Sequence, residues 1–217
     1  MEESEAERVF HIRAADSSGD LGHASNLIGR RYASRGYLTA GLPGAQEPHR
    51  ITLLAQAEDA TIGTITVGFD GPHGLMCEDA FHDEIVEMRR QGRRVCEFTK
   101  LAVESDVRSK TVLASLFHVA YIYAYRVRKS ELLLVEVNPR HVGYYVRMMG
   151  FTVVGEERMN HRVNAPAVLL CLDFRHADEQ IAMLGGRPEM ADQARSLYTH
   201  FLPIAEEHAI LGRLCNH

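Results

Sequence analysis

A single carboxylate in the middle of the chain carries the clearest chemical signal. Residues 94–103 (RVCEFTKLAV) are rich in apolar and β-branched side chains, which predicts a strand, and Glu97 lies within it. A carboxylate that faces a cleft can act as a general base, because it takes a proton from an amine directly or through a water molecule. Glu97 is therefore the candidate catalytic base. The alternative is a glutamate that forms a salt bridge near the end of a strand.

The residues beside Glu97 divide between the two faces of the predicted strand. Alternation places Cys96 and Phe98 on the face opposite Glu97 and Thr99, which favours a packing role for Cys96 over a nucleophilic one. The four cysteines form no C-x-x-C pair, and the twelve histidines show no metal-ligand spacing. We therefore expect no metal site.

Composition and charge limit the class of protein. The chain has 217 residues, of which 46% are hydrophobic and 24% charged, as is normal for a globular protein. No apolar run approaches the roughly 20 residues needed to cross a bilayer. The acidic start, MEESEAERVF, lacks the basic and apolar regions of a signal peptide, so we expect a cytoplasmic protein. A net charge of −5 argues against binding nucleic acid over a broad face.

The apolar pattern predicts strands and helices in alternation. Strands are expected at 9–14, 51–59, 61–69, 94–103, 131–137, 152–158 and 167–174. Helices are expected at 20–35, 77–91, 109–129 and 139–149, and two more in the tail 176–217, broken at 185–188. Asn138 before Pro139 is a cap signal, and Gly150 is a natural C-cap. The strand–helix–strand units at 95–137 and 131–158 imply a mixed, partly parallel α/β sheet with helices on its faces.

Several segments carry a resemblance to a known family. Residues 131–151 (ELLLVEVNPRHVGYYVRMMGF) look like the closing strand and helix of GNAT (Gcn5-related N-acyltransferase) proteins. Residues 96–105 (CEFTKLAVES) resemble a strand of the acyl-homoserine-lactone synthases. The segments GRR at 92–94, NPRHVGYY at 138–145 and VNAPAVLLCLDF at 163–174 are similar to the related long-chain N-acyl amino acid synthase family. The resemblance covers about 70–174, and the N-terminal half shares only the topology.

The resemblance implies both a fold and an activity. It implies a GNAT domain over 1–175, with 176–217 as a C-terminal helical extension packed on the same domain. It also implies an N-acyltransferase that moves a long-chain fatty acyl group from acyl carrier protein to the amine of an amino acid or similar small molecule. No cofactor is bound, because the donor is carried on the phosphopantetheine of the carrier. Two alternatives stay open: an acyl-CoA-dependent N-acetyltransferase, and a non-catalytic GNAT-fold module that binds a lipid or a partner.

The loop before the helix at 109–129 bears on the donor. GNAT enzymes that use CoA usually carry [RQ]-x-x-G-x-[GA] there, so that bare N–H groups approach a pyrophosphate closely. In the matching stretch 108–113 (RSKTVL), Thr111 and Leu113 take the two small positions. Leu113 should crowd CoA, whereas a phosphopantetheine arm needs less room; the alternative is a CoA enzyme that tolerates both substitutions. The expected phosphopantetheine site is Arg108, Ser109, Lys110 and Thr111.

Substrate-binding residues are expected around the strand that bears Glu97. A bulge in this strand would expose a backbone N–H near 101–103 that polarises the thioester carbonyl. Lys100 is expected either to hold the carboxylate of the acceptor or to lie in solvent, and Met148 either to wall an acyl tunnel or to fill the core. The expected substrate- and acyl-binding residues are Phe98, Thr99, Lys100, Leu101, Ala102, Val103, Leu113, Phe117 and Met148.

Tyr145 is the candidate acid that protonates the leaving thiolate, as a tyrosine does in many GNAT enzymes. It stands five residues before Gly150 rather than four, an offset that turns a helical side chain by roughly 100°. The alternative is a packing role for both Tyr144 and Tyr145.

Four arginines precede the central strand: Arg89, Arg90, Arg93 and Arg94. Carrier proteins are acidic, so this cluster is the candidate docking surface for a transient complex with acyl carrier protein. A solvated charge run is the alternative. The second expected partner is the small amine or amino acid acceptor, and weak membrane association through a lipid product is a further expectation.

Overall fold

Within the part of the chain that the structure describes, seven strands form one mixed sheet in the order β1-β2-β3-β4-β5-β7-β6. A computed structural model describes residues 9–38, 42, 47–105 and 110–215. Neighbouring strands are antiparallel except for β4 and β5, which run parallel. The strands are β1 (His11–Ala14), β2 (Arg50–Ala57), β3 (Ala60–Phe69), β4 (Val95–Val103), β5 (Leu132–Val137), β6 (Thr152–Asn160) and β7 (Ala165–Asp173).

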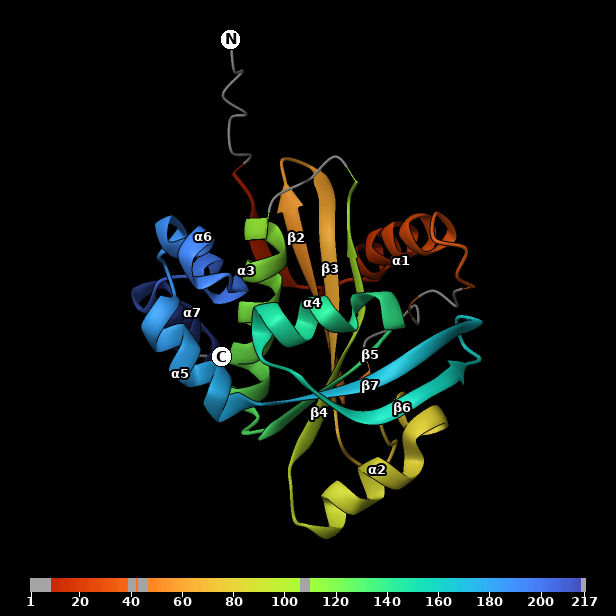
Figure 1. The fold of residues 1–217 in the computed structure, drawn as a ribbon. Coiled ribbons are helices and arrows are strands. Elements are labelled where there is room, and N and C mark those ends of the chain that lie inside the picture. Colours follow the sequence, from red (N-terminus) through yellow and green to blue (C-terminus); the bar gives the residue numbers. More distant parts are fainter. Residues whose placement is uncertain (1–8, 39–41, 43–46, 106–109, 216–217) are drawn as a thin grey trace.

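Helices cover both faces of this sheet. One face, here called the α2 face, is covered by α1 (Ser18–Ala33) and α2 (Glu78–Arg90). The other, the α3 face, is covered by α3 (Lys110–Tyr121), α4 (Pro139–Met149) and the helices that follow β7. These are α5 (Phe174–Leu184), α6 (Ala191–Ala194) and α7 (Ile204–Cys215), with 3-10 turns η2 (Pro188–Met190) and η3 (Leu197–His200). Figure 1 shows α5, α6 and α7 grouped beside α3, with α1 and α2 on the opposite side.

The central strands are buried on both faces, which explains their nearly continuous apolar sequence. In β5, Leu132 and Leu134 pack against Phe81 and Ile85 of α2. Their neighbours Leu133 and Val135 belong to the core on the α3 face. Glu136 follows in the same alternation as Leu132 and Leu134, so a carboxylate points to the α2 face from an otherwise apolar strand.

Strands β4 and β5 pair over a short distance and then separate. Within the described residues their parallel register runs only from Val95 opposite Leu132 to Glu97 opposite Leu134. Beyond that point β4 is bulged, because the register against β3 shifts between Thr64 and Thr66. Lys100 lies at the bulge with a φ of 52°, a conformation that is costly for a residue with a Cβ. The expected bulge is confirmed, and it widens the gap between the two strands.

The predicted order of elements is confirmed, with two local differences. The unit at 131–158 does not give an adjacent parallel pair, because β7 lies between β5 and β6. The helix expected at 109–129 ends as an α-helix at Tyr121 and continues as a π-helix, η1 (Ile122–Val127). The predicted cap signals hold: the Asn138 side chain accepts the N–H of Arg140, and Gly150 ends α4 at a φ of 78°.

The tail differs more from its prediction. The expected break is found, because α5 ends at Leu184. The second predicted helix of the tail does not start there: residues 188–203 form short turns and the four-residue α6, and a longer helix, α7, begins only at Ile204. Helix α5 starts directly after β7, where the Asp173 side chain accepts the N–H of Arg175. The expected boundary at 175 therefore falls inside α5.

Helix α7 is held against α3 by a buried ionic network. Nε2 of His118 lies 3.0 Å from Oε2 of Glu207, and Nε of Arg126 donates to Oε1 of the same carboxylate at 2.7 Å. Nδ1 of His118 accepts the backbone N–H of Leu202, so Nε2 is the ring nitrogen that donates to Glu207. Burial raises the pKa of Glu207, but the hydrogen bonds from His118 and Arg126 outweigh it and lower the pKa overall.

Among the described residues, no helix is long and apolar enough to cross a membrane, and no cluster of His, Cys, Asp and Glu could hold a metal ion. Cys77, Cys96 and Cys171 are buried free thiols, which agrees with the packing role predicted for Cys96.

Candidate active site

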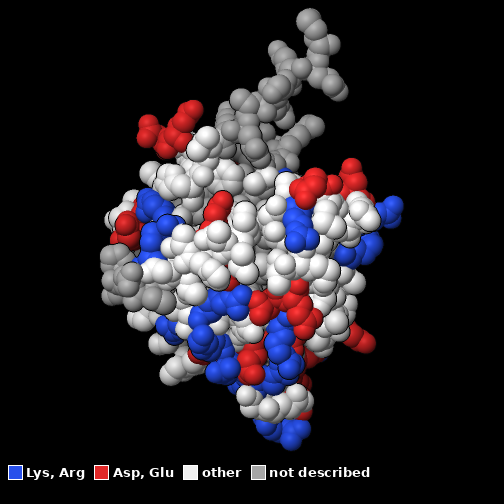
Figure 2. Space-filling view, turned by 90° about the vertical axis from the view of Figure 1, so that its left-hand side faces the viewer, with Lys and Arg blue, Asp and Glu red and all other residues white. Residues whose placement is uncertain are grey.

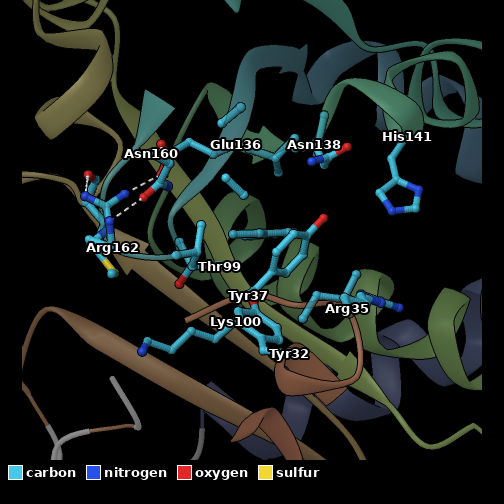
Figure 3. Close-up of a pocket in the computed structure, with 18 of the residues that line it drawn as sticks. Tyr32, Arg35, Tyr37, Thr99, Lys100, Glu136, Asn138, His141, Asn160 and Arg162 are labelled. Atoms are coloured by element: carbon cyan, nitrogen blue, oxygen red, sulfur yellow. Dashed lines mark hydrogen bonds and ion pairs between the residues drawn. The ribbon is translucent and has the colours of Figure 1, made fainter. Parts of the chain in front are cut away.

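A pocket of about 310 Å³ lies where β4 and β5 separate. Residues 98–101 and 135–137 of the two strands line it, together with the end of α1, the start of α4 and the β6–β7 hairpin. Part of the wall is apolar and is formed by Ile65, Phe98, Leu101, Phe117, Val135 and Val137. The polar side chains are drawn in Figure 3 and come from Tyr32, Arg35, Tyr37, Thr99, Lys100, Glu136, Asn138, His141, Asn160 and Arg162.

One corner of the pocket holds a hydrogen-bonded pair of opposite charges. Glu136 receives a hydrogen bond from Nδ2 of Asn160 at 3.0 Å and pairs through its second oxygen with Arg162 (Figure 3). The side chain of Glu136 is 10% exposed and that of Arg162 is 26% exposed. The pKa of Glu136 is raised to about 7, mainly because the group is buried. The charge of Arg162 lowers this pKa, and the charge of Glu97 raises it further. A carboxyl group with this pKa exchanges a proton near neutral pH.

The predicted base, Glu97, lies on the same face of the sheet but is not among the residues that line the pocket. Its two carboxylate oxygens accept the backbone N–H groups of Met76 and Cys77, at 2.8 and 3.1 Å. Burial raises its pKa, and these hydrogen bonds oppose that effect. On the neighbouring strand, Gly68 leaves the room that Glu97 occupies, because a Cβ there would meet the Glu97 side chain at 2.9 Å. The role of Glu97 as a base stays a prediction.

Lys100 and Thr99 line the pocket from the bulge of β4. Burial lowers the pKa of Lys100, and the charges of Arg50 and Arg162 lower it further. The side chains of Lys100 and Arg162 extend toward the same side of the pocket in Figure 3. The bulge therefore aims a cation at the pocket, which fits the expected contact with a carboxylate; that contact and the thioester-polarising N–H stay predictions.

Tyr145 lines the pocket in spite of its offset from Gly150. Its ring packs edge-on against Phe117 and Phe151, with centroids 6.2 and 5.5 Å apart. Burial raises the pKa of its hydroxyl, so the phenol stays protonated at neutral pH and can donate. Its role as the catalytic acid stays a prediction.

This arrangement of a split sheet, a pocket in the gap and a tyrosine on the following helix can be compared with known proteins. The family model described as N-acyl amino acid synthase FeeM matches residues 23–173. The chain belongs to the FeeM family of N-acyl amino acid synthases. It is therefore an acyltransferase of the GNAT fold. A search of curated proteins returned no match.

Solved structures support the fold assignment. The structure of FeeM, an N-acyl amino acid synthase from uncultured soil microbes, has a TM-score of 0.70 at 23% identity and covers 79% of this chain and 93% of that chain. An acetyltransferase of the GNAT family from Streptococcus pneumoniae has a TM-score of 0.53 at 15% identity, covering 76% and 99%. An N-acetyltransferase from Staphylococcus aureus Mu50 also reaches 0.53, at 13% identity, covering 77% and 99%. At these identities the structures bear on the fold alone.

The predicted substrate-binding set of this FeeM-family protein is only partly brought together. Phe98, Thr99, Lys100, Leu101 and Phe117 line the pocket. Four others do not line it. Ala102 packs against Leu27 and Ile28 of α1, and the partly buried Val103, Leu113 and Met148 pack on the core of the α3 face.

The donor loop of this FeeM-family chain is described only in part. Arg108 and Ser109 lie outside the described residues. Lys110 is exposed at the start of α3, and Thr111 follows it in the first turn. Leu113 is partly buried against the core, so its side chain is held in place at the beginning of the helix. The phosphopantetheine contacts stay predictions.

The four arginines predicted to dock a carrier protein are paired within the chain. Arg89 binds Asp70 and Glu78, and Arg90 binds Glu87. Arg93 reaches Asp173 at 3.5 Å, and Arg94 reaches Glu131 at 3.6 Å. On the face shown in Figure 2, Lys and Arg side chains also lie interspersed with Asp and Glu rather than forming one basic area. Carrier docking at these arginines stays a prediction, and these pairs reduce the net charge that would steer it.

Sequence reasoning missed the polar corner and the α1 side of the pocket. Glu136 had a signal, since it is the one charged residue inside the apolar run 132–137. Arg162 and Asn160 had none, because they stand in and beside a hairpin turn rich in polar residues. Tyr32, Arg35 and Tyr37 reach the pocket only through the packing of α1 on β3 and β4.

Proposed function

We propose that this FeeM-family acyltransferase moves a long-chain fatty acyl group from acyl carrier protein to the amine of an amino acid. The observation that carries the proposal is the pocket between β4 and β5, because one pocket combines an apolar wall with a buried charged corner. The wall suits the first carbons of an acyl chain and the corner suits a polar acceptor. The family membership supports the amino acid as acceptor class.

The proposed reaction is a direct displacement. An ammonium group loses a proton to a carboxylate on the α2 face of the sheet, where Glu97 and Glu136 lie, and becomes a nucleophile. The nitrogen then attacks the thioester carbonyl carbon, so that a C–N bond forms and the C–S bond breaks. Tyr145 protonates the leaving thiolate and regains a proton from the nitrogen, and the carboxylic acid returns its proton to solvent. The net products are an amide, a thiol and one proton.

The start of α3 supports carrier protein over CoA as the donor. Thr111 and Leu113 occupy positions where CoA enzymes usually have small residues, and Leu113 is fixed against the core. A leucine at this position leaves less room for a pyrophosphate and adenosine than for a single phosphate. The apolar wall formed by Phe98, Phe117 and Val135 further favours a fatty acyl group over an acetyl group.

Mass spectrometry of lipid extracts tests the proposal in cells. Bacteria that express the protein are compared with the same strain without it, and N-acyl amino acids with long acyl chains are expected only in the expressing cells. If the expressing cells contain none, or contain only N-acetylated small amines, the proposed function is wrong.

A further inference from the structure

We infer that Glu136 and Arg162 together bind the head group of the acceptor: Glu136 faces its amine and Arg162 its carboxylate. The inference rests on the proposed function and deepens it, since it assigns one residue to each charged group of the amino acid acceptor. It also places proton removal at Glu136 rather than at the predicted base, Glu97.

The position of Glu136 brings it closer to a bound amine than Glu97. Glu136 lies on β5 at the level where β4 has moved away, and it lines the pocket, as does Arg162 on the β6–β7 hairpin. Glu97 lies opposite Leu134, which is two residues before Glu136 on β5. Both of its carboxylate oxygens accept backbone N–H groups, those of Met76 and Cys77. An amine in the pocket therefore meets Glu136 first.

The hydrogen bonds of Arg162 and Glu136 leave capacity for a ligand. Arg162 has five N–H donors, and its contacts in the described part of the chain use the carbonyl of Met76, Asp79 and Glu136. These contacts fix the guanidinium in place and leave further N–H groups for a bidentate carboxylate. Asn160 holds the other oxygen of Glu136, so the orientation of the carboxylate is also fixed.

The charges of Glu136 and Arg162 also suit an amino acid. An α-amino acid carries a cation and an anion close together, and the adjacent carboxylate and guanidinium of Glu136 and Arg162 offer the complementary charges. The charged and titratable groups that act on Glu136 are Arg162, Glu97 and Asp79, and Glu136 in turn acts on Cys77 and Tyr32. Burial among these groups raises the pKa of Glu136 to about 7, which suits a group that accepts the ammonium proton near neutral pH.

The proton balance agrees with this placement. The carboxylate of Glu136 takes one proton from the ammonium group and becomes neutral, while Arg162 keeps its charge and holds the acceptor carboxylate. After the amide forms, Glu136 returns the proton to solvent and recovers its pair with Arg162. The thioester and the amino acid supply all the reacting atoms, so no oxidant or reductant is needed.

The test compares a free amino acid with its methyl ester, which lacks the negative charge. A mixture of the twenty amino acids with acyl carrier protein charged with a long-chain acyl group first identifies the acceptor; kcat/KM is then measured for that amino acid and its ester.

Arg162→Gln is the test variant, because glutamine can still donate to the Met76 carbonyl. Arg162→Lys is the conservative rescue. Arg158→Met is the matched control, since Arg158 also ties the hairpin to α2, through Ala80 and Glu84, but outside the pocket.

The wild-type protein should prefer the free acid, and Arg162→Gln should lower its kcat/KM by about 10- to 100-fold, mainly through KM, with little change for the ester. Arg162→Lys should recover part of the preference and Arg158→Met should keep all of it. The inference is wrong if the wild-type protein uses the ester as well as the free acid. It is also wrong if Arg162→Gln keeps the wild-type ratio of kcat/KM between acid and ester. If the wild-type protein acylates no amino acid, the proposed function itself is wrong, which is a different result.

Discussion

Glu136 and Glu97 extend from neighbouring strands to the same face of the sheet, but their surroundings differ. Glu136 is bound by two side chains at the edge of the pocket, whereas Glu97 is bound by two backbone N–H groups behind it. A carboxylate bound by side chains can exchange these partners for a substrate. A carboxylate that satisfies buried backbone donors is costly to remove from them. The two glutamates are therefore expected to respond differently to the same substitution.

Glu136→Gln should lower turnover at neutral pH by about 10²–10⁴-fold, the usual contribution of a general base. In the wild-type protein, kcat/KM should rise as the pH passes about 7, because the carboxylate must be deprotonated to accept the proton. The variant lacks this step and depends on acceptor that is already a free amine. Its defect should therefore shrink as the pH approaches the pKa of the amine. Steady-state rates from neutral to alkaline pH check this, and a defect that stays constant would leave Glu136 with a positioning role only.

Glu97→Gln should act mainly on stability. Glutamine has one acceptor oxygen where glutamate has two, so one of the N–H groups of Met76 and Cys77 loses its partner. The expected loss is about 1–3 kcal/mol in the free energy of unfolding, measured by urea denaturation. The pH profile of the folded variant should match that of the wild-type protein. If Glu97→Gln instead shows the alkaline rescue and Glu136→Gln does not, Glu97 is the base.

The pH dependence of stability gives an independent check on Glu136. Its pKa is raised in the folded protein, so the folded state binds more protons than the unfolded state between the ordinary pKa of glutamate and about 7. The free energy of unfolding should therefore fall as the pH rises through this window. Glu136→Gln lacks this fall. From pH 5 to pH 8 the free energy of unfolding of the variant should therefore rise relative to that of the wild-type protein. Chemical denaturation at both pH values measures it, and an unchanged difference would contradict the raised pKa.

At the scale of elements, α7 packs on the core through apolar residues and is also joined to α3 and η1 by buried polar contacts of Glu207. Glu207→Ala removes the anion that Arg126 and His118 share, so it should destabilise the protein by about 3 kcal/mol or more. The neighbouring Glu206 is exposed on the same helix, so Glu206→Ala is the matched control and should change stability by less than about 0.5 kcal/mol. Thermal melts of the two variants make the comparison. Equal effects would show that α7 is held by its apolar residues instead.

The elements also show how far the sequence could predict the fold. The strands and most helices follow from periodicity, since 132–137 is apolar on both faces and Pro139 and Gly150 mark the ends of α4. The insertion of β7 between β5 and β6 does not follow, because an apolar strand such as 165–173 can pair equally well at several edges. The π-helix at 122–127 has no local signal either, since its residues also suit an α-helix.

At the scale of the whole molecule, the sequence could locate the strand that borders the pocket but not the opposite wall. Thr99, Lys100 and Leu101 lie on β4 together with Glu97, so the prediction of Glu97 as a site residue also led to these pocket residues. Arg162 meets Glu136 only because the β6–β7 hairpin folds back over β5, a contact between residues 26 positions apart. Contacts of this kind depend on the tertiary fold, and a single sequence carries no direct sign of them.

We propose that the protein joins a carrier-bound fatty acyl group to an amino acid, and a comparison of two acyl donors can show whether it does. The purified protein is given the twenty amino acids with long-chain acyl carrier protein or with the matching acyl-CoA at equal concentration, and N-acyl amino acid is quantified by mass spectrometry. We expect an N-acyl amino acid whose acyl chain and amino acid are both identified, and faster formation from the carrier protein than from acyl-CoA. Faster turnover with acyl-CoA would contradict the assigned donor, and no amide from either donor would contradict the claim as a whole.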